Sequence, residues 1–187
     1  MSKKHAGIVQ KQFTRTVDAF SKFATRDTPE MLADRVRFAN PQPEEIVLDV
    51  ACGPGTLVLA LAPRVRFARG IDLTYAMLCQ AAASRLERNI PNVCFDQGDG
   101  ERLPYPAAAF DLVTCQFALH HMPRPEAALK EMGRVTRARG RLLIADTLGP
   151  ESDEKWDLHN RIETIRDPSH TASLRLTTFL KLFEETG

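Results

Sequence analysis

Acidic residues and glycines lie close together at two places in the first half of this 187-residue chain. Residues 47–55 read Val-Leu-Asp-Val-Ala-Cys-Gly-Pro-Gly, and Asp72 follows in the stretch Gly-Ile-Asp-Leu-Thr. An apolar strand that leads into a glycine turn and a helix, before a second strand that ends in an acid, is typical of a site for an adenosyl cofactor. Glycines let the backbone approach such a ligand, and the carboxylate of Asp72 can accept from both hydroxyls of a ribose.

Asp49 distinguishes this pattern from a dinucleotide site. It lies inside the first predicted strand, four residues before Gly53, where its carboxylate can meet the ammonium group of a bound amino acid. A dinucleotide needs its pyrophosphate at the helix N-terminus, and a nearby acid would repel that charge. The pattern therefore disfavours a nicotinamide-dependent oxidoreductase, which stays an alternative, as do turn or capping roles for Asp49 and Asp72.

Polar groups also follow the third, fourth and fifth predicted strands. Asp99 lies in Gln-Gly-Asp-Gly-Glu at residues 97–101 and can accept from the exocyclic amine of an adenine, or be an ordinary loop acid. His120 and His121 follow the apolar run that begins at residue 110. An imidazole titrates near neutral pH, so either histidine can serve as a general base, and structural hydrogen bonding is the alternative. For Asp146, at the end of the fifth strand, a functional and a structural role are equally open.

The elements that position these residues alternate between strand and helix from residue 46 onwards. Strands are expected at 46–51, 67–72, 93–96, 110–117 and 140–146. Helices are expected at 8–24, 29–39, 55–63, 74–88, 125–135, 151–165 and 177–186, with Thr28 as the cap of the second. Such alternation predicts an α/β fold, in which a Rossmann-like, doubly wound and mainly parallel sheet has helices on both faces.

The length predicts one domain over residues 1–187. It divides into a helical lead-in at 1–43, a cofactor-binding core at 44–148 and C-terminal helices at 149–187. The acceptor pocket is expected to be built by the N-terminal helices, the loop after His121 and the region 150–176. His159 and His170 could approach the substrate from there, and surface or packing roles are the alternative. The Pro-rich stretch after the second predicted helix separates the lead-in from the core.

The composition of the chain indicates which partners to expect and in which cellular compartment the protein resides. The formal net charge of +1 gives no field that would attract nucleic acid or a membrane surface. The four cysteines have no C-x-x-C spacing, so we expect reduced thiols, with no disulfide framework and no metal site. No signal peptide or membrane span is visible in the sequence, and we expect a cytoplasmic protein with a small-molecule substrate.

The chain resembles the class I S-adenosylmethionine-dependent methyltransferases. Within them it is most similar to methyltransferase type 11, the subgroup of the ubiquinone and menaquinone biosynthesis C-methyltransferases. The stretches that carry the resemblance are VLDVACGPGT, GIDLTYAML, GDGERLPYPAAAFDLVTC, ALHHMPRPEAALKEMGRVTRARGRLLIAD and the later RDPSH. Their order and spacing over about residues 46 to 170 make chance similarity implausible.

The resemblance implies S-adenosylmethionine as the cofactor and a role for each matching position. The methionine moiety would be lined by Asp49, Ala51, Gly53 and Gly55, and the ribose would be held by Asp72. The adenine would be flanked by Leu73 and Met77, and its edge would be contacted by Asp99 and the Gly100 amide. The sulfonium would have Gln116 beside it. The helix around residues 9–13 is expected to be a lid. Ala51 departs from the family, which often has glycine there. The implied activity is C- or O-methylation of a quinol-like or phenol-like metabolite, and a non-catalytic cofactor-binding module is the alternative.

The family sheet normally has seven strands, of which the last two form a hairpin. After the fifth predicted strand this sequence shows only helical patterns, so we expect that hairpin to be missing. The apolar fifth strand would then have an exposed edge, which natural proteins avoid. Either the chain is a shortened version of a longer protein, or another element or a second copy covers this edge.

Overall fold

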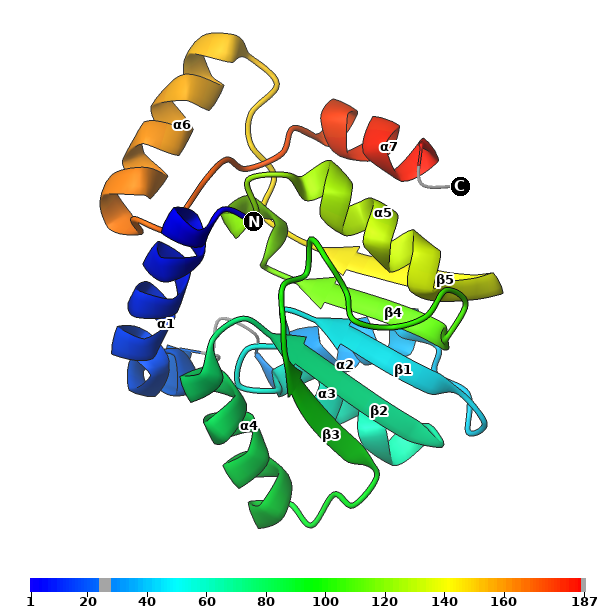
Figure 1. Ribbon diagram of the computed structural model, residues 1–187. Coiled ribbons are helices and arrows are strands. Elements are labelled where there is room, and N and C mark those ends of the chain that lie inside the picture. The colour runs from blue at the N-terminus through cyan, green and yellow to red at the C-terminus, as the bar shows by residue number, and fades with distance from the viewer. Residues whose placement is uncertain (24–27, 186–187) are drawn as a thin grey trace.

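The computed structural model describes residues 1–23 and 28–185, so residue 24 of the first predicted helix and residue 186 of the last lie outside the described residues. The strands are β1 Ile46–Val50, β2 Phe67–Asp72, β3 Val93–Gln97, β4 Phe110–Gln116 and β5 Thr136–Ala145. They form one parallel sheet in the order β3-β2-β1-β4-β5 (Figure 1). The order reverses between the neighbours β1 and β4, and such a reversal opens a crevice at the carboxyl ends of the strands.

The helices agree with the sequence pattern to within a few residues. They are α1 Lys3–Phe23, α2 Pro29–Ala39, α3 Thr56–Leu61, α4 Tyr75–Glu87, α5 Pro125–Val135, α6 Asp153–Arg166 and α7 Leu176–Glu184. Thr28 caps α2 as predicted, because its hydroxyl accepts from the Met31 amide at 3.3 Å. None of the described helices is both long and apolar enough to cross a membrane.

Two apolar clusters hold the helices on opposite faces of the sheet. Val47 packs with Val36 of α2 and Leu61 of α3 in one cluster. Leu48, the next residue of β1, packs with Met132 of α5 in the other. Successive residues of a strand point to opposite faces, so β1 is buried on both sides. The predicted doubly wound α/β fold is confirmed.

The start of β5 differs from the sequence prediction. The strand begins at Thr136, directly after α5, and not at residue 140. Thr136 pairs with Phe110, but the register then shifts before Arg141 pairs with Leu112. Arg139 takes up this irregularity in a left-handed conformation at φ 67°. The sequence did not reveal the early start because the bulged residues are polar or small and lack a strand pattern.

The outer side of β5 has no strand partner within residues 1–23 and 28–185. One face of this strand is nevertheless covered. Phe179 and Phe183 of α7 pack against the same cluster as Leu142 and Ile144. The apolar side chains of β5 are therefore partly buried although its backbone edge is open, and self-association along this edge stays a prediction.

Candidate functional site

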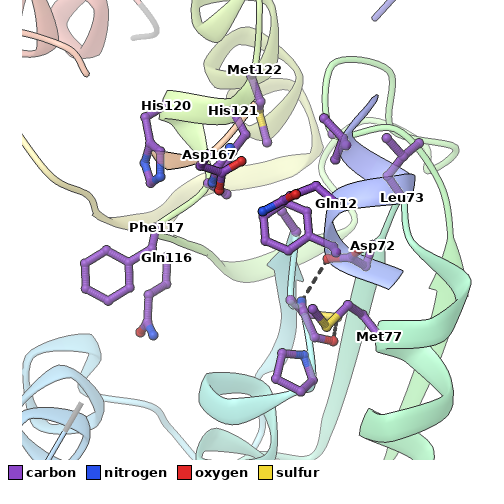
Figure 2. A pocket seen from close by; sticks show the side chains of 18 of the residues that line it. Gln12, Asp72, Leu73, Met77, Gln116, Phe117, His120, His121, Met122 and Asp167 are labelled. Carbon is purple, nitrogen blue, oxygen red and sulfur yellow. Dashed lines mark hydrogen bonds between the residues drawn. The ribbon is translucent and has the colours of Figure 1, made fainter. Parts of the chain in front are cut away.

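A cavity of about 510 Å³ lies at the carboxyl ends of β1, β2 and β4, where the strand order reverses (Figure 2). Most of the predicted cofactor residues line it: Asp49, Ala51, Gly53, Asp72, Leu73, Met77, Gly100 and Gln116. His120 and His121 line it as well. Gly55 and Asp99 are not among its lining residues.

Asp72 ends β2 with its carboxylate fixed against the glycine turn. One oxygen accepts from the Gly53 amide at 2.9 Å and the other from the Thr74 amide at 2.7 Å (Figure 2). Burial raises the pKa of this carboxyl, and the two backbone amides offset only part of that rise. Each carboxylate oxygen has a second lone pair, so Asp72 can hold the turn and still accept from a ligand.

Asp49 is a buried acid in the middle of the sheet. Its side chain accepts from the Thr114 hydroxyl at 2.7 Å, and the residue is 2% exposed. Burial raises the pKa of Asp49 to about 7, against hydrogen bonds from Thr114 and the Val58 backbone, and the charge of Asp72 adds to the rise. A cationic group in the cavity would stabilise the ionised form of Asp49.

The turn between β1 and α3 contains three residues in the left-handed region, Ala51 at φ 55°, Gly53 at φ 53° and Gly55 at φ 84°. A Cβ on Gly53 would meet nothing within 4 Å, so this glycine leaves open space beside the cavity. A Cβ on Gly55 would lie 3.1 Å from Cβ of Ala81 and from Leu59. Gly55 therefore allows α3 to pack closely, and the contact with the methionine moiety that the resemblance implied stays a prediction.

We expect Ala51→Gly to stabilise the protein by about 0.5 to 1 kcal/mol, because a left-handed conformation costs alanine roughly that much or more. Denaturant unfolding of the ligand-free protein measures the change. Ala127→Gly in α5 is the matched control, and helix propensity predicts a loss of about 1 kcal/mol there. A loss of stability in both variants would contradict backbone strain at position 51.

Asp99 points its charge at the N-terminus of the chain. Its carboxylate pairs with the ammonium group of Met1 at 2.7 Å and also accepts from the Glu101 amide at 2.9 Å. Met1 itself lines the cavity. Next to Asp99, the lack of a side chain at Gly100 lets the backbone pack closely in the cavity wall. A Cβ at this position would lie 3.0 Å from Met122 and from Val50.

Helix α1 closes the cavity from outside the sheet, in the place expected for a lid. Its residues Val9, Gln12, Phe13 and Thr16 line the cavity. Two side chains of α1 attach it to the core. Gln10 donates to the carbonyl of Leu73 at 3.1 Å, and Nε2 of His5 donates to the carbonyl of His121 at 2.9 Å.

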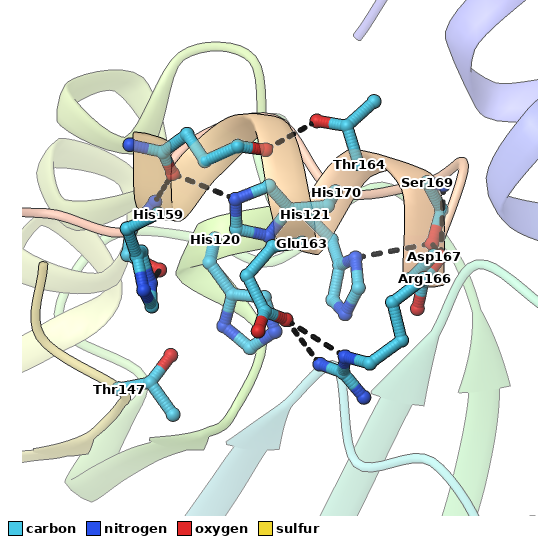
Figure 3. Close-up of polar contacts among 12 residues, drawn as sticks. His120, His121, Thr147, His159, Glu163, Thr164, Arg166, Asp167, Ser169 and His170 are labelled. Atoms are coloured by element: carbon cyan, nitrogen blue, oxygen red, sulfur yellow. Dashed lines mark hydrogen bonds and ion pairs between the residues drawn. The ribbon is translucent and has the colours of Figure 1, made fainter. Parts of the chain in front are cut away.

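The two predicted histidines occupy the opposite end of the cavity from Asp72 and are held by different acids. Nδ1 of His120 lies 2.5 Å from Oδ1 of Asp146, at the end of β5. Nδ1 of His121 lies 3.1 Å from the Ser169 hydroxyl, which donates to Asp167 at 2.5 Å (Figure 3). Burial, together with the neighbouring His120, lowers the pKa of His121 to about 4.

Helix α6 and the loop after it form a further wall of the cavity, in the region that was expected to contribute to the acceptor pocket. His159, Glu163, Arg166 and Asp167 line the cavity from there, and Glu163 pairs with Arg166 (Figure 3). The sequence prediction named His159 as a residue that could approach the substrate, but it did not identify Glu163, Arg166 or Asp167 as lining residues. His170, expected to have a packing role, is buried and bonds Asn160 at 2.8 Å.

The chain is similar to known proteins over the segment that forms this cavity. A family described as a methyltransferase domain matches residues 48–144, just over half of the chain. The chain belongs to this family. The match runs from β1 to β5 and includes both acids and both histidines of the cavity.

Named relatives agree with this domain assignment. The uncharacterized methyltransferase YcgJ of Bacillus subtilis is 34% identical over 154 residues, which are 82% of this chain and 61% of YcgJ. A putative methyltransferase of Bacillus halodurans has a crystal structure that superposes with a TM-score of 0.81 at 36% identity, over 83% of this chain and 68% of that one. A demethylmenaquinone methyltransferase of Beutenbergia cavernae is 37% identical over 109 residues, which are 58% of this chain and 43% of that protein. The chain thus spans 61% of YcgJ and 43% of the demethylmenaquinone methyltransferase, which is less than two thirds of each of these curated relatives.

The family implies S-adenosylmethionine as the cofactor, and the residues of the cavity fit it. Asp49 is a buried acid whose raised pKa shows that its charge lacks compensation inside the protein. The ammonium group of the cofactor would supply that compensation. Asp72 presents acceptors for a ribose, and Leu73 and Met77 offer an apolar wall for a base.

Proposed function

We propose that this methyltransferase domain transfers a methyl group from S-adenosylmethionine to a small phenol-like or quinol-like acceptor. The observation that carries the proposal is a single cavity with two acids at one end and two histidines at the other. Its volume of about 510 Å³ lies within the range of about 300–1,000 Å³ that small-molecule sites occupy.

The charges at the histidine end disfavour an anionic acceptor, because Asp167 lines this end in addition to the ion pair of Glu163 and Arg166. Arg166 is the cation among the described residues that line this end, and it is already paired with Glu163. His121, with its pKa lowered to about 4, is neutral near pH 7. A quinol or phenol is neutral before it reacts, and the similarity to a demethylmenaquinone methyltransferase supports the same class.

Different residues of the cavity would bind different parts of the cofactor. Asp49 would bind the ammonium group, Asp72 the ribose, and Leu73 with Met77 the adenine. The bound cofactor supplies an electrophilic methyl group on a sulfonium. The lid α1 and the apolar walls exclude water and align the acceptor, which can contribute about 7–11 kcal/mol towards the barrier.

Calorimetric titration of the purified chain with S-adenosylmethionine and S-adenosylhomocysteine tests the cofactor site. Transfer of label from methyl-labelled S-adenosylmethionine to hydroquinone, catechol and simple phenols then tests the reaction. Micromolar binding with label in the phenolic product supports the proposal. Binding without transfer to any acceptor would identify a non-catalytic module, and no binding by a folded sample would refute the cofactor site.

A further inference from the structure

His120 and Asp146 form a closely held pair at the acceptor end of the cavity. Nδ1 of His120 lies 2.5 Å from Oδ1 of Asp146, and the Asp146 side chain is only 6% exposed. The Asp146 carboxylate is fixed by three more donors, the Thr147 amide at 2.7 Å, the Thr147 hydroxyl at 3.4 Å and the His120 amide at 3.3 Å. Burial opposes ionisation of Asp146, but these bonds outweigh it and lower the pKa of the carboxyl.

The pairing determines where the proton of His120 sits. An ionised carboxylate only accepts hydrogen bonds, so Nδ1 of His120 must carry the proton. The neutral ring then has its lone pair on Nε2. Among the described residues no group donates to this nitrogen, and His120 lines the cavity. Nε2 of His120 is therefore available to a proton that arrives with a ligand.

His121 is the same tautomer as His120 but accepts a further proton less readily. The Ser169 hydroxyl gives its single proton to Asp167, so its oxygen must accept from Nδ1 of His121. A proton taken up by His121 would meet a neutral hydroxyl and not a carboxylate. Burial and the adjacent His120, at 4.1 Å between ring centroids, disfavour the charged ring and lower the pKa of His121 to about 4. His121 is thus a weak base in a fixed orientation.

We infer that His120 is the general base of the methyl transfer and that Asp146 positions it and stabilises its charged form. This assignment rests on the proposed function. The acceptor O–H bond breaks as its proton moves to Nε2 of His120, and an electron pair of that oxygen forms the new bond to the methyl carbon. The pair of the broken sulfur–methyl bond stays on sulfur. The imidazolium, which faces Asp146 through Nδ1–H, later releases its proton to solvent.

The test compares Asp146→Asn, His120→Gln and His121→Gln in the full chain, with the phenolic acceptor that the parent turns over fastest. We expect Asp146→Asn and His120→Gln to lower kcat by at least about 100-fold, the lower range for loss of a general base. The KM of the acceptor and the affinity for S-adenosylmethionine should change less than about threefold. Ser169→Ala, which removes the partner of His121, is the matched control and should lower kcat far less than Asp146→Asn.

Histidine-selective nitrogen NMR of the cofactor-free protein gives a readout that does not need turnover. In the parent, the Nδ1 proton of His120 should resonate far downfield, and Asp146→Asn should move this signal upfield. A proton on Nε2 of His120, or a signal unchanged in Asp146→Asn, would overturn the positioning role. Full kcat in His120→Gln would overturn the base assignment alone. Failure of the parent to methylate any acceptor would overturn the proposed function, and the base assignment with it.

Discussion

Asp72→Ala is expected to weaken the binding of S-adenosylmethionine by about 100-fold to 10,000-fold. The carboxylate can accept from two ribose hydroxyls, and a hydrogen bond to a charged group contributes about 1.5–3 kcal/mol. Asp72 lies at the carboxyl end of β2 with both oxygens on backbone amides, so it needs no rearrangement to meet a ligand. Calorimetric titration with S-adenosylmethionine measures the loss.

The same carboxylate supports the glycine turn, so the experiment must separate binding from folding. Asp72→Asn keeps one acceptor oxygen and should fall between the parent and the alanine variant. Asp96→Ala is the matched control, because Asp96 also lies near the end of a strand but bonds Arg69 and Tyr105 outside the cavity. Circular dichroism confirms that each variant is folded. Parent-like affinity in Asp72→Ala would refute the assignment of the ribose site.

The parts of the site that were predictable are those in which chemistry and local structure coincide. Asp49 and Gly53 belong to one short stretch, and Asp72 ends the next strand. A parallel sheet brings the carboxyl ends of adjacent strands to one edge. The alternation of strand and helix was therefore enough to place these residues around one cavity.

The parts that could not be predicted depend on contacts between distant segments. Thr114 bonds Asp49 across 65 residues, and Ser169 bonds His121 across 48. No local pattern encodes such pairs. The region of α6 was expected to contribute to the acceptor pocket, but which of its side chains line the cavity, such as Glu163 and Arg166, depends on how the helix packs over the sheet.

Asp99 and Gly55 illustrate a different limit. Both stand in stretches that match the family, yet in the structure Asp99 pairs with the ammonium group of Met1 and Gly55 lies against Ala81. A motif locates the backbone well but does not state which side chain faces the ligand. The Gly100 backbone lines the cavity, and its contact with the adenine edge, like that of Asp99, stays a prediction.

The affinity for S-adenosylmethionine is expected to rise with pH up to about 7. Asp49 has a pKa raised to about 7 by burial, so it is largely protonated in the ligand-free protein below that pH. Pairing with the ammonium group requires the carboxylate, and binding must then release a proton. The dissociation constant should increase about tenfold for each pH unit below 7. Above about pH 8 affinity should decline again, as an ordinary α-amino group loses its charge.

Asp49→Asn should remove this pH dependence and weaken binding about 10-fold to 100-fold at pH 7.5. The asparagine carbonyl can still accept from Thr114, so packing is preserved. 5′-Methylthioadenosine, which lacks the amino acid part, is the matched ligand. It should bind Asp49→Asn and the parent equally at every pH, whereas Asp72→Ala should lose it. Parent-like pH dependence in Asp49→Asn would show that another group titrates.

The stability of the ligand-free protein should fall as the pH rises towards 7, whereas the affinity for S-adenosylmethionine should rise. Because the folded-state pKa of Asp49 lies above its usual value, the acid stabilises the fold at low pH, and that contribution is lost as the pH rises from about 4 to 7. At pH 8 the parent holds a buried charge that pairs with no cationic side chain of the described residues, and Asp49→Asn does not hold this charge. The variant should therefore unfold at a higher denaturant concentration than the parent at pH 8, and saturating S-adenosylmethionine should reverse the order. A buried carboxylate whose cationic partner arrives only with the ligand is expected to lower the stability of the ligand-free protein.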